Sequence, residues 1–166
     1  MTDSLTVVNP ESLVRLYGGI PSLEEFRLRS INLDWRGPTV TLRLDLSSFP
    51  GAAPPEWEGA DVDTVQCHLQ FLAVADLSLT EWTPPARPSF RSTSLGEERR
   101  MRVRVTGAGV DLDFTSSQFT RVGHVSAFKI KADGTDGSRH YFLQKLDSMR
   151  FETIPGTDEK TFHGRL

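Results

Sequence analysis

The sequence predicts a mainly β fold of the α+β class: an antiparallel β-sandwich or partly open barrel of about eight strands, with a short N-terminal helix docked on it. Apolar and polar residues alternate over long stretches, which is typical of strands with one buried face. Turn signals separate these stretches at hairpin distances, so neighbouring strands are expected to pair antiparallel. The 166 residues have the length of one domain and contain no internal repeat, so residues 1–166 are interpreted as a single domain.

The one clear helical pattern follows residue 9. Asn9 is expected as the N-cap, Pro10 as the first helical residue and Glu11 as an acid in the first turn. Gly18 and Gly19 are expected to end the helix. A helix of about two turns is not stable alone, so its apolar face must dock on the sheet.

A strand pair is predicted after the helix. Alternation runs through residues 26–35, and its phase slips at Arg29 and Ser30, which indicates a β-bulge. Residues 36–38 form the expected turn, and residues 40–46 alternate most clearly of all.

Two long loops and several further strands are predicted in the remainder of the chain. The prolines in residues 47–60 and 83–97 favour loops. Arginines in residues 101–105 and aspartates in 110–114 predict favourable cross-strand pairs, with a turn at 106–109. The other expected strands cover residues 61–71, 74–82, 122–131 and 139–151, and residues 155–166 are expected to form a flexible tail.

Composition indicates a globular protein of the cytoplasm. The hydrophobic share of 37% argues against disorder, and the net charge of −3 argues mildly against nucleic-acid binding. Cys67 is the only cysteine, so an internal disulfide is impossible, which fits a reducing compartment. We find no signal peptide at the N-terminus, and no apolar run reaches the ~20 residues of a membrane span.

No catalytic, metal or cofactor motif stands out in the sequence. The histidines are scattered without metal-ligand spacing, although His68 and His124 lie on expected strands and can meet in the fold. Cys67 alternates with Val65 and Leu69, which predicts a core position. We find no phosphate-binding loop and no nucleophile elbow. The sequence therefore favours a protein that is not an enzyme and needs no cofactor.

One loop has an unusual charge pattern. From Leu44 to Ala86 the chain contains no lysine or arginine. Four acidic residues surround one tryptophan in the first part of this stretch: Glu56, Glu58, Asp61 and Asp63 around Trp57. Two interpretations remain open: a solvated acidic loop, or a partner-binding loop in which Trp57 is an anchor and the acids steer a basic partner.

The segment 17–46 (YGGIPSLEEFRLRSINLDWRGPTVTLRLDL) resembles the opening of immunity protein family 50, and looser patterns extend the resemblance over residues 12–131. The resemblance implies a bacterial, cytoplasmic antidote that binds a cognate toxin protein. Many relatives place a His-Asp pair where this chain has Glu24 and Glu25. No catalytic residue is carried over from the family.

Two other classes of function remain alternatives. One is a small-ligand-binding β-barrel or a hydrolase that uses His68 or His124, because the mouth of a barrel can hold such a site. The other is a structural or oligomerisation module. The sequence leaves open the identity of the toxin, the oligomeric state and the choice between sandwich and barrel.

Overall fold

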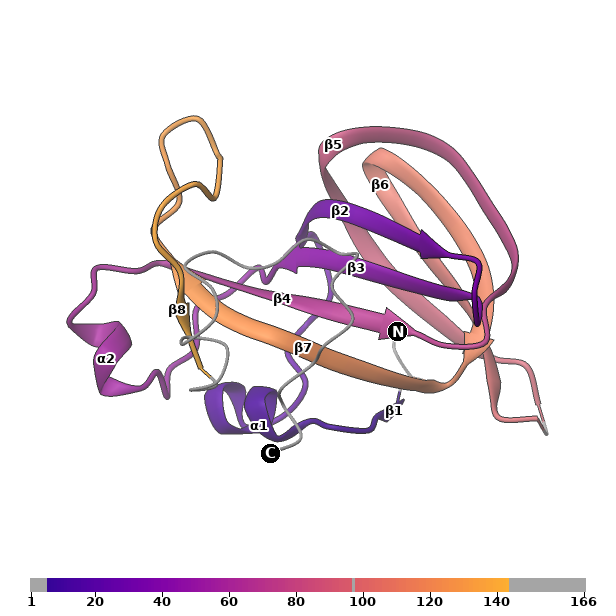
Figure 1. Cartoon of the computed structure of the whole chain (residues 1–166), viewed down its shortest axis with the longest axis horizontal. Helices are drawn as coiled ribbons and strands as arrows, with labels where there is room; N and C mark the ends of the chain where they lie inside the picture. The colour runs from indigo at the N-terminus through magenta and orange to yellow at the C-terminus, as the bar shows by residue number, and fades with distance from the viewer. Residues whose placement is uncertain (1–5, 97, 144–166) are drawn as a thin grey trace.

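The computed structural model describes residues 6–96 and 98–143. Within these residues, eight strands form one sheet in the order β1-β7-β4-β3-β2-β5-β6, and β8 pairs with β7. The sheet curls into a half-barrel (Figure 1), which confirms the predicted mainly β fold. The elements are β1 (Thr6–Val7), α1 (Glu11–Tyr17), β2 (Arg27–Asp34), β3 (Thr39–Asp45), α2 (Pro55–Glu58), β4 (Thr64–Phe71), β5 (Ala75–Ser94), β6 (Arg100–Ser117), β7 (Phe119–Phe128) and β8 (Tyr141–Phe142).

The strand pair β2–β3 matches the sequence pattern closely. The register shifts between Leu28, opposite Leu44, and Ser30, opposite Arg43. The predicted bulge at residues 29–30 is therefore confirmed. Because of this shift, the apolar residues on both sides of the bulge can face the same core.

The second predicted loop, residues 83–97, is wrong over most of its length. Strand β5 continues to Ser94, and its pairing with β6 jumps from Trp82–Val110 to Arg87–Ala108. Pro84 and Pro85 lie in the unpaired stretch between these two pairs. A bulge tolerates proline because its residues need not donate a backbone N–H to the ladder.

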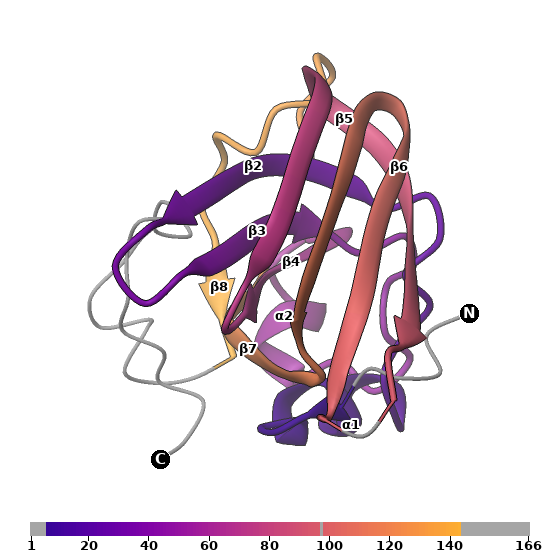
Figure 2. The same ribbon diagram turned by 90° about the vertical axis from the view of Figure 1, so that its right-hand side faces the viewer.

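Strand β6 reverses direction near residues 106–109, as the sequence predicts, although residues 106–108 remain paired with β5. Figure 2 shows the two limbs of β6 side by side, with β5 arching around them. Arg102 and Arg104 on the first limb both form ion pairs with Asp113 on the second. The predicted arginine–aspartate pairs are therefore confirmed.

The N-terminal helix forms as predicted, but its start differs. Gly18 ends α1 in the left-handed conformation, whereas Pro10 occupies the N-cap position without a side-chain cap. Asn9 is not the cap. Its side-chain Nδ2 donates to Val122 O and its Oδ1 accepts from Val122 N–H. The asparagine thus joins the start of α1 to β7, and Leu13 and Leu16 dock the helix on the core.

The core lies inside the curl of the sheet. Phe71 of β4 contacts Phe90 of β5 and Phe114 of β6, with ring centroids 5.8 and 5.2 Å apart. Cys67 is buried on β4, as predicted, and burial raises the pKa of its thiol to about 12.

The last predicted elements fall partly outside the described residues. Only Tyr141 and Phe142 of the expected strand 139–151 are seen as strand β8, and the expected tail 155–166 lies outside the described residues. No helix in the described ranges is both long enough and apolar enough to cross a membrane.

Candidate partner-binding site

The acidic loop lies between β3 and β4 and contains α2. Trp57, the expected anchor residue, is only 2% exposed, and its ring lies 6.4 Å from that of Phe49. In this conformation the indole fixes the loop to the core and does not present a surface to a partner. Whether the loop binds a partner stays a prediction.

The acids beside Trp57 lie on the surface. Glu56 and Glu58 flank the buried tryptophan on α2, and both are exposed. Asp61 is also exposed and lies 3.8 Å from the ammonium of Lys129. A buried tryptophan therefore holds exposed carboxylates in place at this end of the molecule, on the left in Figure 1.

Asp63 has a structural role in the loop. Its Oδ1 accepts hydrogen bonds from Ile130 N–H and Thr64 Oγ1, and Lys129 lies 3.3 Å from its other oxygen. Burial alone would raise the pKa of Asp63, but these donors outweigh it and lower the pKa. Asp63 thus ties the acidic loop to the chain after β7.

The structure brings His68 and His124 together, as the sequence allowed. Their rings meet edge to face with centroids 5.0 Å apart, and both side chains are buried. A buried imidazole does not meet a substrate in solvent without a rearrangement. Within the described ranges, no three His, Cys, Asp or Glu side chains gather as a metal ion would need.

A polar layer on the β3–β4 face was not predicted. On this face Gln66 Nε2 donates to Asp45 Oδ1 and Asp136 Oδ2, at 2.6 and 2.9 Å. Arg29 pairs with Asp45, with Nε–Oδ2 2.9 Å, and Arg43 pairs with Asp136. Alternation alone predicted a wet face here, because it shows which residues share a face but not what covers that face.

The cover is the segment 129–140, which we call the clasp. The carbonyl oxygen of Gly134 in the clasp accepts hydrogen bonds from Arg27 Nη1 and Arg29 Nη1, at 2.7 and 2.9 Å. Burial would raise the pKa of Asp136, but Gln66 and the nearby arginines outweigh it and lower the pKa. The clasp is therefore held by charged hydrogen bonds to β2, β3 and β4.

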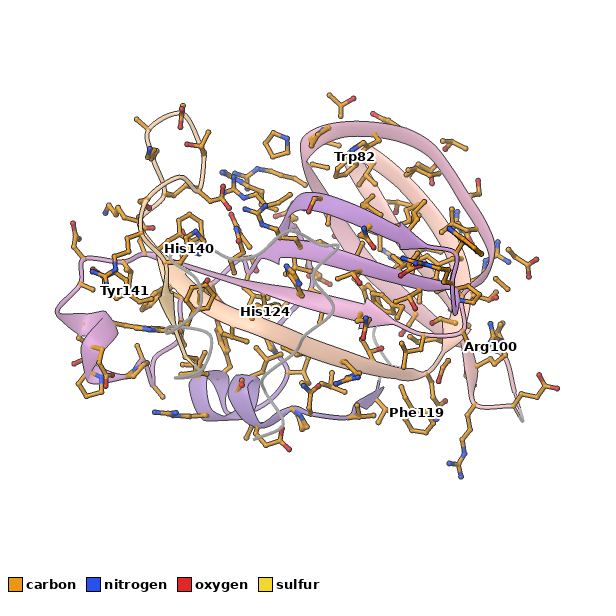
Figure 3. The ribbon with its side chains drawn as sticks, in the orientation of Figure 1. Trp82, Arg100, Phe119, His124, His140 and Tyr141 are labelled. Atoms are coloured by element: carbon orange, nitrogen blue, oxygen red, sulfur yellow. The ribbon has the colours of Figure 1, made fainter. Side chains whose placement is uncertain are left out.

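His140 ends the clasp. Its Nδ1 lies 2.8 Å from Ser126 Oγ, its Nε2 lies 3.0 Å from Asp136 O, and its ring stacks on Phe128. Burial lowers its pKa. Figure 3 shows His140 and Tyr141 together beside β8, with Trp82 and Arg100 at the other end of the molecule.

Glu24 and Glu25 lie between α1 and β2 and are both exposed. Glu25 has a positive φ of 52° and its N–H donates to Ser89 Oγ. The two side chains make no shared acid site with the histidines, which are buried on β4 and β7.

Comparison with known proteins gives one match. A family model described as Immunity protein 50 matches residues 9–128. No curated protein and no solved structure matches the chain. The matched region starts at Asn9 and ends with the last residue of β7, so it includes α1 and β2–β7 and stops before the clasp.

Proposed function

Because this chain belongs to the Immunity protein 50 family, we propose that it is a bacterial immunity protein that binds a cognate toxin domain and neutralises it without catalysis. The observation that carries the proposal is the family match over residues 9–128, which spans most of the sheet. We place the action of the protein in the bacterial cytoplasm, as one half of a polymorphic toxin system.

The exposed acids of the α2 loop support electrostatic recognition. Glu56, Glu58 and Asp61 project from a short segment that Trp57 fixes to the core. Charges held in this way accelerate the encounter with a basic partner and favour one orientation. We propose that these residues form part of the toxin-binding surface, together with Asp63, which also bonds within the chain. Trp57 supports this surface from the core.

The positions of the histidines support a binding protein over a hydrolase. His68 and His124 are the residues that a hydrolase would use, and both are buried in the sheet. General acid–base catalysis requires hydrogen-bond reach to a substrate. An interface needs only a complementary surface of roughly 1,600 Å² in total.

The first test is co-expression with the adjacent toxin gene in a susceptible bacterium. Cells that carry both genes are expected to grow, whereas cells with the toxin alone are expected to die. Killing in the presence of well-expressed, folded protein would contradict the proposal.

The second test reverses the charges of the α2 loop. The double variant Glu56→Lys/Glu58→Lys is expected to slow association with the purified toxin domain by about tenfold, because the steering charges are inverted. Glu24→Lys/Glu25→Lys is the matched control, since it makes the same change of charge at another exposed acidic pair. Equal association rates for the two variants, measured by surface plasmon resonance, would remove the α2 loop from the interface.

A further inference from the structure

The half-barrel is open along one seam. Among the described residues, β2 and β5 pair only at Leu28 and Ala86. Beyond Leu28, residues 30–34 of β2 pair with β3 alone. Residues 75–82, the first limb of β5, pair with β6. Figure 2 shows β2 and this limb running in different directions. We call the surface formed by residues 31–35 and 77–82 the wedge.

Exposure increases along β2 away from the closed end of the wedge. Leu28 is buried and Ile31 is partly buried, whereas Leu33 is 51% exposed and Trp35 is 83% exposed. Leu33 lies directly opposite Val40, which is buried. The core of the half-barrel therefore covers the β3 side of this pair but leaves the end of β2 exposed.

The β5 border shows the same gradient. Ala86 is buried, Trp82 and Leu79 are partly buried, and Leu77 is 38% exposed. Two strands that diverge from one contact thus leave apolar side chains exposed on both sides. Trp82 marks the β5 border in Figure 3.

The open end of the wedge is held in shape before any partner binds. Arg36 N–H donates to Asp34 Oδ1, and the Arg36 guanidinium lies 6.0 Å from the ring centroid of Trp35. Pro38 O accepts from Val74 N–H, which joins the β2–β3 turn to the β4–β5 connection. Less conformational entropy is lost on binding when the anchor residues are already fixed.

The charge of the wedge indicates the kind of partner. Asp76 and Glu81 are exposed on the β5 border, and this stretch of the chain has no lysine or arginine up to Arg87. Residues 31–35 on the β2 border include no lysine or arginine, and the adjacent Arg36 already contacts Trp35 and Asp34. The wedge therefore complements a segment that carries apolar and basic side chains.

We propose that the wedge binds an extended, basic segment of the toxin. This segment pairs with the edge of β2 that no other strand of the described residues occupies, and packs apolar side chains on Leu33 and Trp35. Addition of a strand to an exposed edge uses main-chain hydrogen bonds for affinity and side-chain contacts for specificity. This inference rests on the proposed function and names the anchor of the interface. The α2 loop lies at the opposite end of the half-barrel from the β2–β3 turn (Figure 1), so the two surfaces can be tested separately.

The experiment compares Trp35→Ala and Leu33→Lys with Leu95→Lys. Leu95 is 52% exposed and lies in the β5–β6 connection, outside the wedge, so it matches Leu33 in residue type and exposure. Binding to a catalytically inactive toxin domain is measured by surface plasmon resonance. The two wedge variants are expected to dissociate at least about tenfold faster, because apolar anchors control dissociation. Leu95→Lys is expected to match the wild type.

Each other outcome has a distinct meaning. If the wild type binds and both wedge variants bind equally well, the wedge is not the anchor, although the proposed function stands. If the wild type does not bind or protect, the proposed function itself fails. If light scattering shows a wild-type dimer that Leu33→Lys dissociates, while toxin binding is unchanged, a second copy occupies the wedge and the proposal is wrong. Urea midpoints confirm that Trp35→Ala and Leu33→Lys are folded.

Discussion

His140 couples the clasp to the sheet through groups that sense pH. One ring nitrogen lies beside the Ser126 hydroxyl and the other beside the carbonyl of Asp136. Because burial lowers its pKa, His140 binds a proton less readily than an ordinary histidine, whose pKa is about 6.5. In this pH range the unfolded chain therefore binds more protons at this position than the folded chain does.

The sign of the pH effect follows from this difference. The stabilisation from the neutral imidazole is fully present above the unfolded pKa and decreases as pH falls towards the folded pKa. His140→Gln removes the titrating group, so its unfolding free energy should decrease less than that of the wild type between pH 7.5 and 5.5. Urea unfolding across this range measures the slope.

Ser126→Ala is the control for this prediction. It removes the hydroxyl beside Nδ1 but leaves the imidazole in place. It should cost about 1 kcal/mol of stability and keep most of the pH dependence. Equal slopes for the wild type and His140→Gln would contradict the role assigned to His140.

Two residues show what residue-level reasoning could and could not predict. Trp57 stands among acids in a proline-rich loop, and its burial depends on Phe49 and the core beneath, which no local pattern reveals. Asn9 is a good N-cap residue by type. Its side chain instead forms two hydrogen bonds with the backbone of Val122, which lies far along the chain. In contrast, the core position of Cys67 followed from simple alternation.

At the scale of elements, the nested pair β5 and β6 depends on close backbone approach. A Cβ on Gly107 would lie 2.6 Å from Arg87 O and 2.7 Å from Pro88 Cα. A Cβ on Gly109 would lie 2.6 Å from Thr83 O, and Gly109 has a φ of +88°. Glycine at these positions lets the bulge of β5 cross the reversal of β6.

Alanine at these glycines is therefore expected to destabilise the fold. Gly107→Ala and Gly109→Ala should each lower the unfolding free energy by about 1–3 kcal/mol, because the atoms met are backbone atoms that cannot move aside easily. Gly51→Ala is the control, since a Cβ there meets nothing within 4 Å. Urea midpoints measure the difference; a wild-type midpoint for both variants would disprove the close approach.

The same elements explain why one loop was predicted wrongly. Pro84, Pro85 and Pro88 are typical of loops, so residues 83–97 were expected to be irregular. The structure keeps the strand because the first two lie in a bulge, while Pro88 pairs with Gly107. Strands with plain alternation, such as β3, were predictable because their pattern reports the two faces directly. The clasp could not be predicted in this way, because its contacts with Arg27, Arg29 and Gln66 join residues more than sixty positions apart in the sequence.

At the scale of the whole molecule, the proposed function predicts a dependence on salt. The chain has a net charge of −3, and the α2 loop concentrates exposed acids at one end. Association with a basic toxin domain should slow as ionic strength rises, because the Debye length falls from about 10 Å at 0.1 M to about 3 Å at 1 M. Stopped-flow association rates at increasing salt measure the effect.

The loop variant provides the comparison for this dependence. Glu56→Lys/Glu58→Lys should show a flatter salt dependence than the wild type, whereas Trp35→Ala should show the same slope with faster dissociation. A salt-independent wild-type rate would mean that steering charge has no part in the encounter.

Strand β7 carries a short strand beside each of its ends, and this has a consequence for the behaviour of the protein in a crowded cell. β1 pairs with Thr120 and its neighbour Phe119 in parallel, and β8 pairs with Ser126 and Ala127. These additions leave little backbone on β7 for a foreign chain, whereas β2 beyond Leu28 keeps a longer edge that pairs with no other strand of the described residues. Growth of a fibril needs a long row of unpaired backbone groups at a sheet edge, so the two short strands protect the β7 border against edge-to-edge aggregation.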